Sequence, residues 1–121
     1  MAAGRYDLVI EQGATFSRQV TWQNSNGSAV NLTGYTIAGK IRRKTSDIQA
    51  LASFTCTVTD ATNGVFTFSL TATQTSSLPV MHSQTSEKEY LDCVYDIEAT
   101  TGSTVYRILE GIAKISPQVT K

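Results

Sequence analysis

Residues 89–98 read EYLDCVYDIE, residues 101–103 read TGS, and residues 104–116 read TVYRILEGIAKIS. Valine, isoleucine and tyrosine recur along both long runs, which suits strands on a pleated, half-buried sheet. The Thr-Gly-Ser triplet between them supplies the polar and conformationally permissive residues of a hairpin connection. Pro117 then withdraws a backbone N–H donor and ends the second run. This stretch therefore predicts two long antiparallel strands that close the fold.

The second run of this hairpin carries apolar residues on both faces. One parity holds Val105, Leu109, Gly111, Ala113 and Ile115, and the other holds Tyr106, Ile108 and Ile112. A β-bulge midway, with Gly111 as a possible place, would switch the parity within one core. Burial of the second face by a neighbouring subunit would explain the pattern equally well, and Tyr106, Ile108 and Ile112 would then be contact residues.

The rest of the chain repeats shorter runs with the same period of two. The expected strands are residues 6–10, 15–22, 35–42, 54–58 and 65–70, with turns at 24–28 and 60–64. Thr71 and Gln74 have the spacing of a capping box, so a short helix follows, and an irregular segment begins after Pro79. About seven strands with regular turns and one crossover helix predict an all-β fold, an antiparallel Ig-like β-sandwich in a single domain over residues 1–121. The cysteine–tryptophan–cysteine order of true Ig domains is missing, because Trp22 precedes both cysteines.

Charge is sparse and balanced in this chain. Ten basic and ten acidic residues give a formal net charge of +0, and 17% of the residues are charged. Such a chain offers no electrostatic case for binding nucleic acid or an anionic membrane. No apolar run approaches the ~20 residues of a membrane-spanning helix, and the first residues lack the apolar region of a signal peptide. Balanced charge protects weakly against self-association, which suits a subunit of an assembly.

The residue types that carry out catalysis are few and scattered. His82 is the one histidine and falls in the least regular segment, so no Ser-His-acid arrangement is indicated. Cys56 and Cys93 have no CxxC partners, which leaves no predicted metal site. We interpret both cysteines as small, unpaired core residues, with a disulfide as the less favoured alternative. Phosphate-binding glycine loops are absent as well. The sequence therefore predicts no enzyme and no cofactor.

Two groups of charged residues stand out along the strands. Arg42, Arg43 and Lys44 form a basic run at a strand exit. They are candidates for contact with an acidic partner or a phosphate, although a solvated strand edge is the more common meaning of such a run. Asp92, Asp96 and Glu98 share one strand face, and we expect them to pair with lysine or arginine across strands rather than to hydrolyse glycosides.

The aromatic residues divide into a core group and a surface group. Trp22, Tyr35 and Tyr95 lie on the apolar parity of their strands, so we expect them to pack in the core. Tyr90 and Tyr106 remain as candidates for stacking on a sugar ring. They define an alternative function, binding of carbohydrate.

Several stretches resemble small β-sandwich proteins of tailed bacteriophages. Near the C-terminus, residues 95–98 read YDIE and residues 107–120 read RILEGIAKISPQVT. The same style appears in IEQGATF at 10–16, in VNLTGY at 30–35 and in the helical segment 70–79. Over nearly the whole chain, the sequence is similar to the Ig-like N-terminal domain of siphophage baseplate upper proteins. These motifs are structural, and none of them is catalytic.

The resemblance implies a structural protein of the virion. In baseplate upper proteins this domain is followed by helical and receptor-linked regions, whereas this chain ends at Lys121. The expectation is therefore a small adaptor or decoration subunit that docks on tail, baseplate, neck or fibre-attachment proteins. It would be a homo-oligomer or be present in several copies, located in the virion after assembly in the host cytoplasm. The alternative is a carbohydrate-binding adhesion module on the virion surface.

Overall fold

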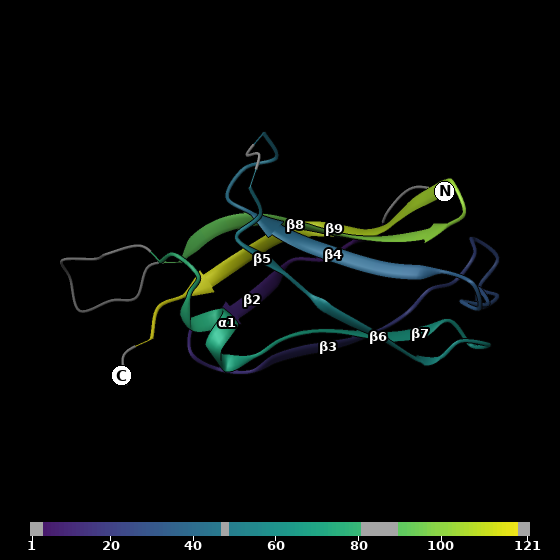
Figure 1. Ribbon diagram of the computed structural model, residues 1–121, viewed down its shortest axis with the longest axis horizontal. Coiled ribbons are helices and arrows are strands. Elements are labelled where there is room, and N and C mark those ends of the chain that lie inside the picture. Colours follow the sequence, from purple (N-terminus) through teal and green to yellow (C-terminus); the bar gives the residue numbers. More distant parts are fainter. Residues whose placement is uncertain (1–3, 47–48, 81–89, 119–121) are drawn as a thin grey trace.

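The computed structural model describes residues 4–46, 49–80 and 90–118, which form two facing β-sheets and one short helix (Figure 1). Strands account for 57% of the described residues and helix for 5%. Sheet A contains β1 (Gly4–Arg5), β2 (Leu8–Glu11), β4 (Thr36–Arg42), β5 (Ala52–Ser53), β8 (Leu91–Thr101) and β9 (Thr104–Ser116). Sheet B contains β3 (Phe16–Thr21), β6 (Thr55–Asp60) and β7 (Val65–Leu70). The helix is α1 (Ala72–Ser76).

The strand order corrects the expectation of a purely antiparallel fold. In sheet A the order is β1-β9-β8-β4-β5, and β2 also pairs with β9. Both N-terminal strands run parallel to β9, with Leu8 opposite Ala113 and Ile10 opposite Ile115. A tight hairpin forces antiparallel pairing, but nearly the whole chain separates β2 from β9, so either direction is accessible. The described residues form nine strands instead of about seven, because short edge strands were not visible in the alternation.

One bent segment joins the two sheets along one side. Ser53 in β5 pairs with Lys40 of sheet A, and two residues later Thr55 in β6 pairs with Ser69 of sheet B. Phe54 lies at the corner, where its backbone N–H donates to the carbonyl of Gly39 at 2.9 Å. Its buried ring packs edge-on against Phe68 at 5.0 Å. The chain therefore changes sheets at Phe54 while the core stays closed.

The core lies between the sheets and draws alternate residues from both. The expected inward face of β7, formed by Phe66, Phe68 and Leu70, is buried, which confirms the period of two. Val58 lies on the same parity of β6 as Cys56 but is 38% exposed, because the register shifts next to it at the end of this edge strand. The buried apolar residues include Leu8, Ile10, Phe16, Trp22, Leu32, Ile41, Phe54, Leu78, Tyr95, Ile97, Ala113 and Ile115.

Both cysteines are free, as expected. Cys93 is buried in β8, whereas Cys56 in β6 is only half buried.

A β-bulge explains most of the two-faced pattern of β9. Ile97 is opposite Leu109 and Glu98 is opposite Arg107, so Ile108 is the extra residue. The bulge lies three residues before Gly111, which the sequence pattern offers as a possible place. It turns both Ile108 and Leu109 toward the core, where they are 8% and 9% exposed. Burial by a second subunit is therefore not needed to account for Ile108.

Gly111 has a different role from the one expected. A side-chain carbon at this position would lie 2.2 Å from the backbone oxygen of Tyr6. The Tyr95 hydroxyl donates to the same Tyr6 oxygen, and the Ile112 N–H donates to the Asp7 carboxylate at 2.9 Å. The missing side chain thus lets the segment between β1 and β2 lie directly against β9.

The capping box at α1 is confirmed. The Gln74 N–H donates to the Thr71 hydroxyl oxygen at 3.1 Å, and the Thr71 N–H donates to the Gln74 side-chain oxygen at 2.9 Å. Inside the helix, the buried Thr75 hydroxyl accepts from the Gly13 N–H at 3.0 Å and donates to the Ala14 carbonyl at 2.9 Å. These bonds tie α1 to the turn between β2 and β3, at the end of the molecule where β9 finishes (Figure 1). Most of the irregular segment expected at 80–88 lies outside the described residues.

Candidate functional site

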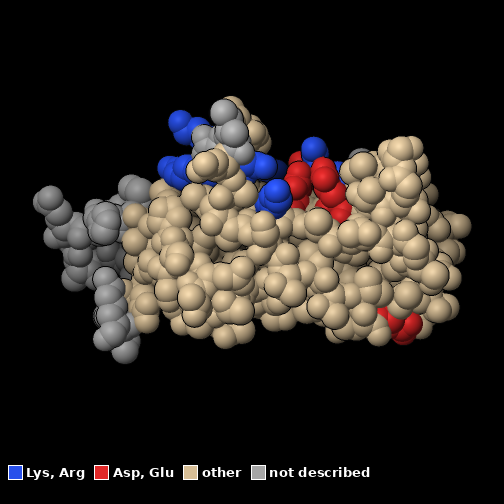
Figure 2. Space-filling model, viewed as in Figure 1, with Lys and Arg blue, Asp and Glu red and all other residues tan. Residues whose placement is uncertain are grey.

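Charge is distributed very unequally between the two sheets. Among the described residues, charged side chains belong to sheet A or to the segments flanking its strands, except for Arg18 in β3 and Asp60 in β6. Figure 2 shows basic and acidic atoms gathered along the side where sheet A lies in Figure 1. The outward positions of sheet B carry hydroxyl and amide side chains instead: Ser17, Gln19, Thr21, Thr55, Thr57, Thr67 and Ser69. The two faces therefore offer different chemistry to a partner.

A shallow groove of about 350 Å³ crosses the outer face of sheet A. Its floor is formed by Val94 and Ile112, which are opposite each other on β8 and β9 and are half buried. Lys40 and Arg42 of β4 line one side, and Arg5 of β1 lines the other. The outward-facing side chains of these strands thus form an apolar floor between basic walls.

Acidic residues occupy one end of the groove and share a single arginine. Asp96, Glu110 and Arg107 come from β8 and β9, and Arg107 lies 3.3 Å from the Asp96 carboxylate and 3.7 Å from that of Glu110. Arg5 lies 3.4 Å from the Asp7 carboxylate. Lys40 is opposite Asp96 in the register but forms no ion pair with any residue of the described ranges. These side chains are well exposed, so each existing pair stabilises the fold only slightly.

The expected carboxylate row and basic run both belong to this face. Lys114 lies 3.2 Å from Asp92 and Arg107 pairs with Asp96, which confirms cross-strand pairing for these two carboxylates. Arg43 donates from its guanidinium to the Asp92 carbonyl at 2.6 Å. It is exposed, as is Lys44 in the segment after β4, and of the basic run only Arg42 lines the groove.

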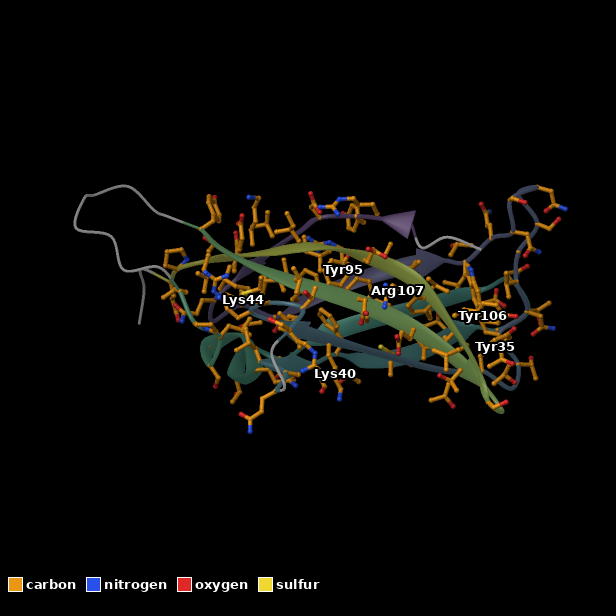
Figure 3. All side chains as sticks on the ribbon, turned by 90° about the horizontal axis from the view of Figure 1, so that it is seen from above. Tyr35, Lys40, Lys44, Tyr95, Tyr106 and Arg107 are labelled. Carbon is orange, nitrogen blue, oxygen red and sulfur yellow. The ribbon has the colours of Figure 1, made fainter. Side chains whose placement is uncertain are left out.

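The aromatic candidates do not form one platform. Tyr106 lies with Trp22 and Tyr35 at one end of the molecule, with ring centroids 5.8 and 6.3 Å from its own, as Figure 3 shows for the two tyrosines. Tyr90 precedes the opposite end of β8, so the two candidate tyrosines are separated by roughly 30 Å of strand. They are 50% (Tyr90) and 37% (Tyr106) exposed. One sugar ring therefore cannot contact Tyr90 and Tyr106 at the same time.

A second hollow, of about 760 Å³, lies beside this aromatic cluster. Trp22, Gln23 and Asn24 line it, together with Ile108 at the bulge. Although Ile108 reaches this hollow, it is a buried core residue and not an open contact surface. Among the interface candidates from the sequence, the structure brings Arg42 and Ile112 into the groove and leaves Tyr106 at the far end.

Of the residues that form the floor and the basic walls of the groove, Arg5, Lys40 and Val94 were not among the sequence candidates. The alternation of residues 35–42 places Lys40 on the outer face, so part of the signal was present. The pairing of β4 with β8 and of β1 with β9 was not, because neither follows from local sequence.

No described group has the surroundings of a nucleophile or a metal ligand set. Within residues 4–46, 49–80 and 90–118, no three His, Cys, Asp or Glu side chains come together as metal ligands would. Burial raises the pKa of the Cys56 thiol to about 11 and also raises that of Cys93, although the nearby Arg43 lowers the latter. Burial raises the pKa of Tyr95 as well. These groups stay protonated at neutral pH. His82 lies outside the described residues.

A scan against protein-family models found no match, and a search of curated proteins found none. The described residues also contain no helix that is both long and apolar enough to cross a membrane.

Proposed function

We propose that this chain is a structural subunit of a tailed-bacteriophage particle that works by docking and not by catalysis. Its partners would be other virion proteins of the tail, baseplate, neck or fibre-attachment region. The resemblance of the closing hairpin and of the segments at 10–16 and 30–35 to baseplate upper proteins supports this proposal. The subunit would be present in several copies in the virion, after assembly in the host cytoplasm.

We further propose that the fold is Ig-like. The neighbours β4-β8-β9 in one sheet and β3-β7-β6 in the other have the order of strands C-F-G and B-E-D in an Ig domain. The difference lies at the N-terminus, where β1 and β2 pair with β9 rather than with β3. The lack of a cysteine on β3 accounts for the missing disulfide within this assignment.

The observation that carries the docking proposal is the concentration of charge on sheet A. Basic and acidic side chains lie close together on this face, which favours recognition of a partner with the complementary pattern of charge. Such complementarity fixes the orientation of the partner and excludes wrong partners. A chain of zero net charge gains nothing from such an arrangement through long-range attraction, so its value lies in contact.

Co-purification tests this proposal. The tagged chain is coexpressed with the virion proteins encoded by the neighbouring genes, and complexes are sized by light scattering after gel filtration. The expected result is a complex of defined stoichiometry with at least one virion protein. A chain that persists as a monomer and binds none of them would count strongly against the proposal.

The hollow beside Trp22 favours one second candidate, binding of glycan. Tyr106, which is 37% exposed and packs on Trp22 beside the hollow, provides a stacking surface, and Gln23 and Asn24 provide hydrogen-bonding groups for a sugar. In a glycan array, Tyr106→Ala and Asn24→Ala should weaken binding, whereas Tyr90→Ala at the opposite end should not. If the wild-type chain binds no glycan, this second candidate is removed.

A further inference from the structure

The groove on sheet A has a composition that selects among possible ligands. Across the sheet, one row reads Lys40, Asp96, Glu110 and Arg5, and the next begins with Arg42, Val94 and Ile112. Arg107 already lies between the two carboxylates of the first row. The basic wall on β4 therefore keeps positive charge available at Lys40, next to an apolar floor.

We propose that this groove binds a short extended acidic segment of a partner protein, with carboxylates at alternate positions beside an apolar residue. The carboxylates would meet Lys40 and Arg42, and the apolar side chain would rest on Val94 and Ile112. The inference rests on the proposed docking function, because it names the chemistry of the partner that sheet A recognises.

The dimensions of the groove fit an extended segment. Lys40 and Arg42 are two residues apart on one strand, so their side chains leave the sheet about 7 Å apart. Alternate side chains of an extended peptide have the same spacing, which lets two carboxylates face the two cations. The walls on β4 and β1 are three strand spacings apart, about 14 Å, which is wide enough for a strand lying along β8 and β9. A volume of about 350 Å³ limits the contact to a few side chains.

Nucleic acid fits the same groove poorly. Asp96 and Glu110 are part of its lining, and a continuous phosphate backbone would place charge against them. A peptide can carry carboxylates at the basic wall alone and leave the acidic end uncovered. Tyr95, the aromatic residue of the lining, is buried at 4% exposure, so its ring is not open for a base to stack on.

Titration with defined peptides tests the proposal. The probes are a fluorescein-labelled peptide of alternating glutamate and valine, the same peptide with glutamine for glutamate, and an oligo-dT strand. The full chain is titrated by fluorescence anisotropy, and amide shifts are followed by two-dimensional NMR. We expect binding of the glutamate peptide that weakens with salt, with shifts centred on residues 40–42, 94 and 110–112.

Paired variants separate the groove from charge in general. K40E combined with R42E should weaken the glutamate peptide at least about tenfold, whereas K114E should change its affinity less than about twofold. Lys114 is a suitable control because it lies on the same face but outside the groove lining. K114E reverses one positive charge, as each of the two groove substitutions does. The single variant K40Q should weaken binding and keeps the acidic end unchanged.

Three results would overturn the inference. They are equal binding of the glutamine peptide, shifts that lie away from the groove, and tighter binding of oligo-dT with shifts in the groove. If the chain forms a complex with a virion protein and K40E/R42E leaves that complex intact, the groove assignment fails while the docking function stands. If the peptide binds as expected but no virion protein does, the docking function fails and the groove remains an acidic-peptide site.

Discussion

Among the glycines, Gly111 has the least room for a side chain. A Cβ atom there would lie 2.2 Å from the Tyr6 oxygen and 2.8 Å from the Tyr6 carbonyl carbon, and both belong to the backbone. Gly111→Ala should therefore push β1 and β2 off β9 and lower the free energy of unfolding by about 3 kcal/mol, at the upper end for overpacking. Urea denaturation followed by circular dichroism measures the change.

Gly4→Ala is the matched control for this prediction. Gly4 lies on the same edge, but a Cβ there would meet its nearest atoms at 3.6 and 3.7 Å, which is ordinary contact. Its effect should stay within about 0.5 kcal/mol. Equal stability of the two variants would show that the close approach of Tyr6 is not needed.

The buried thiols predict loss of stability in alkali. The pKa of Cys56 is about 11 in the folded chain, against an ordinary value of 9.0 when unfolded. Between these values the unfolded chain loses the thiol proton and the folded chain keeps it, so stability present below pH 9.0 falls as pH rises toward 11. Urea midpoints should be lower at about pH 10.5 than at about pH 8, and this drop should be smaller in Cys56→Ser, which cannot ionise. An identical drop in both chains would contradict the assignment to Cys56.

At the scale of elements, the buried Thr75 hydroxyl ties α1 to the turn between β2 and β3. Thr75→Val keeps the shape of the side chain but leaves the Gly13 N–H and the Ala14 carbonyl without this partner. The expected loss is about 1–3 kcal/mol, the cost of unsatisfied buried polar groups. Thr75→Ser keeps the hydroxyl and loses one methyl group, so it should cost about 1 kcal/mol or less. If valine proves as well tolerated as serine in urea denaturation, the hydroxyl does not anchor the helix.

Elements were predictable from sequence where their signals are local. The alternation of Phe66, Phe68 and Leu70 and the spacing of Thr71 and Gln74 lie within a few residues, and both predictions were confirmed. The parallel partners of β9 and the neighbours of Lys40 depend on which distant strands come together, and no local pattern encodes that. The groove could therefore be anticipated at Arg42 and Ile112 but not assembled from sequence.

At the scale of the whole molecule, the edge of β3 is one place where two copies of the chain can meet. Among the described residues β3 pairs with β7 alone, so its other edge is open, and Arg18 lies on the core parity of that strand, between Phe16 and Val20. Its guanidinium covers the Phe16 ring, 4.6 Å from the centroid. A charge on the inward parity of an edge strand discourages pairing with another chain.

Arg18→Val should therefore increase self-association relative to the wild-type chain. The valine completes an uninterrupted apolar face on an edge strand, which favours edge-to-edge contact. Light scattering at matched concentrations measures the change, and Arg18→Lys, which keeps the charge, should behave like wild type. A valine variant with the wild-type mass distribution would show that Arg18 does not protect the edge.

The extra residue at Ile108 also sets a rule for how this chain can change in length. The extra residue reverses which side chains of β9 face inward. The inward-facing positions between the hairpin tip and the bulge therefore have the opposite parity to those after the bulge. Deletion of one residue between the tip and the bulge would turn either Arg107 or the tip residues toward the core. Adding or removing one cross-strand pair next to the tip at Gly102 would leave every other side chain of β9 on its present face. Natural variation in the length of this hairpin should accordingly come in steps of two residues.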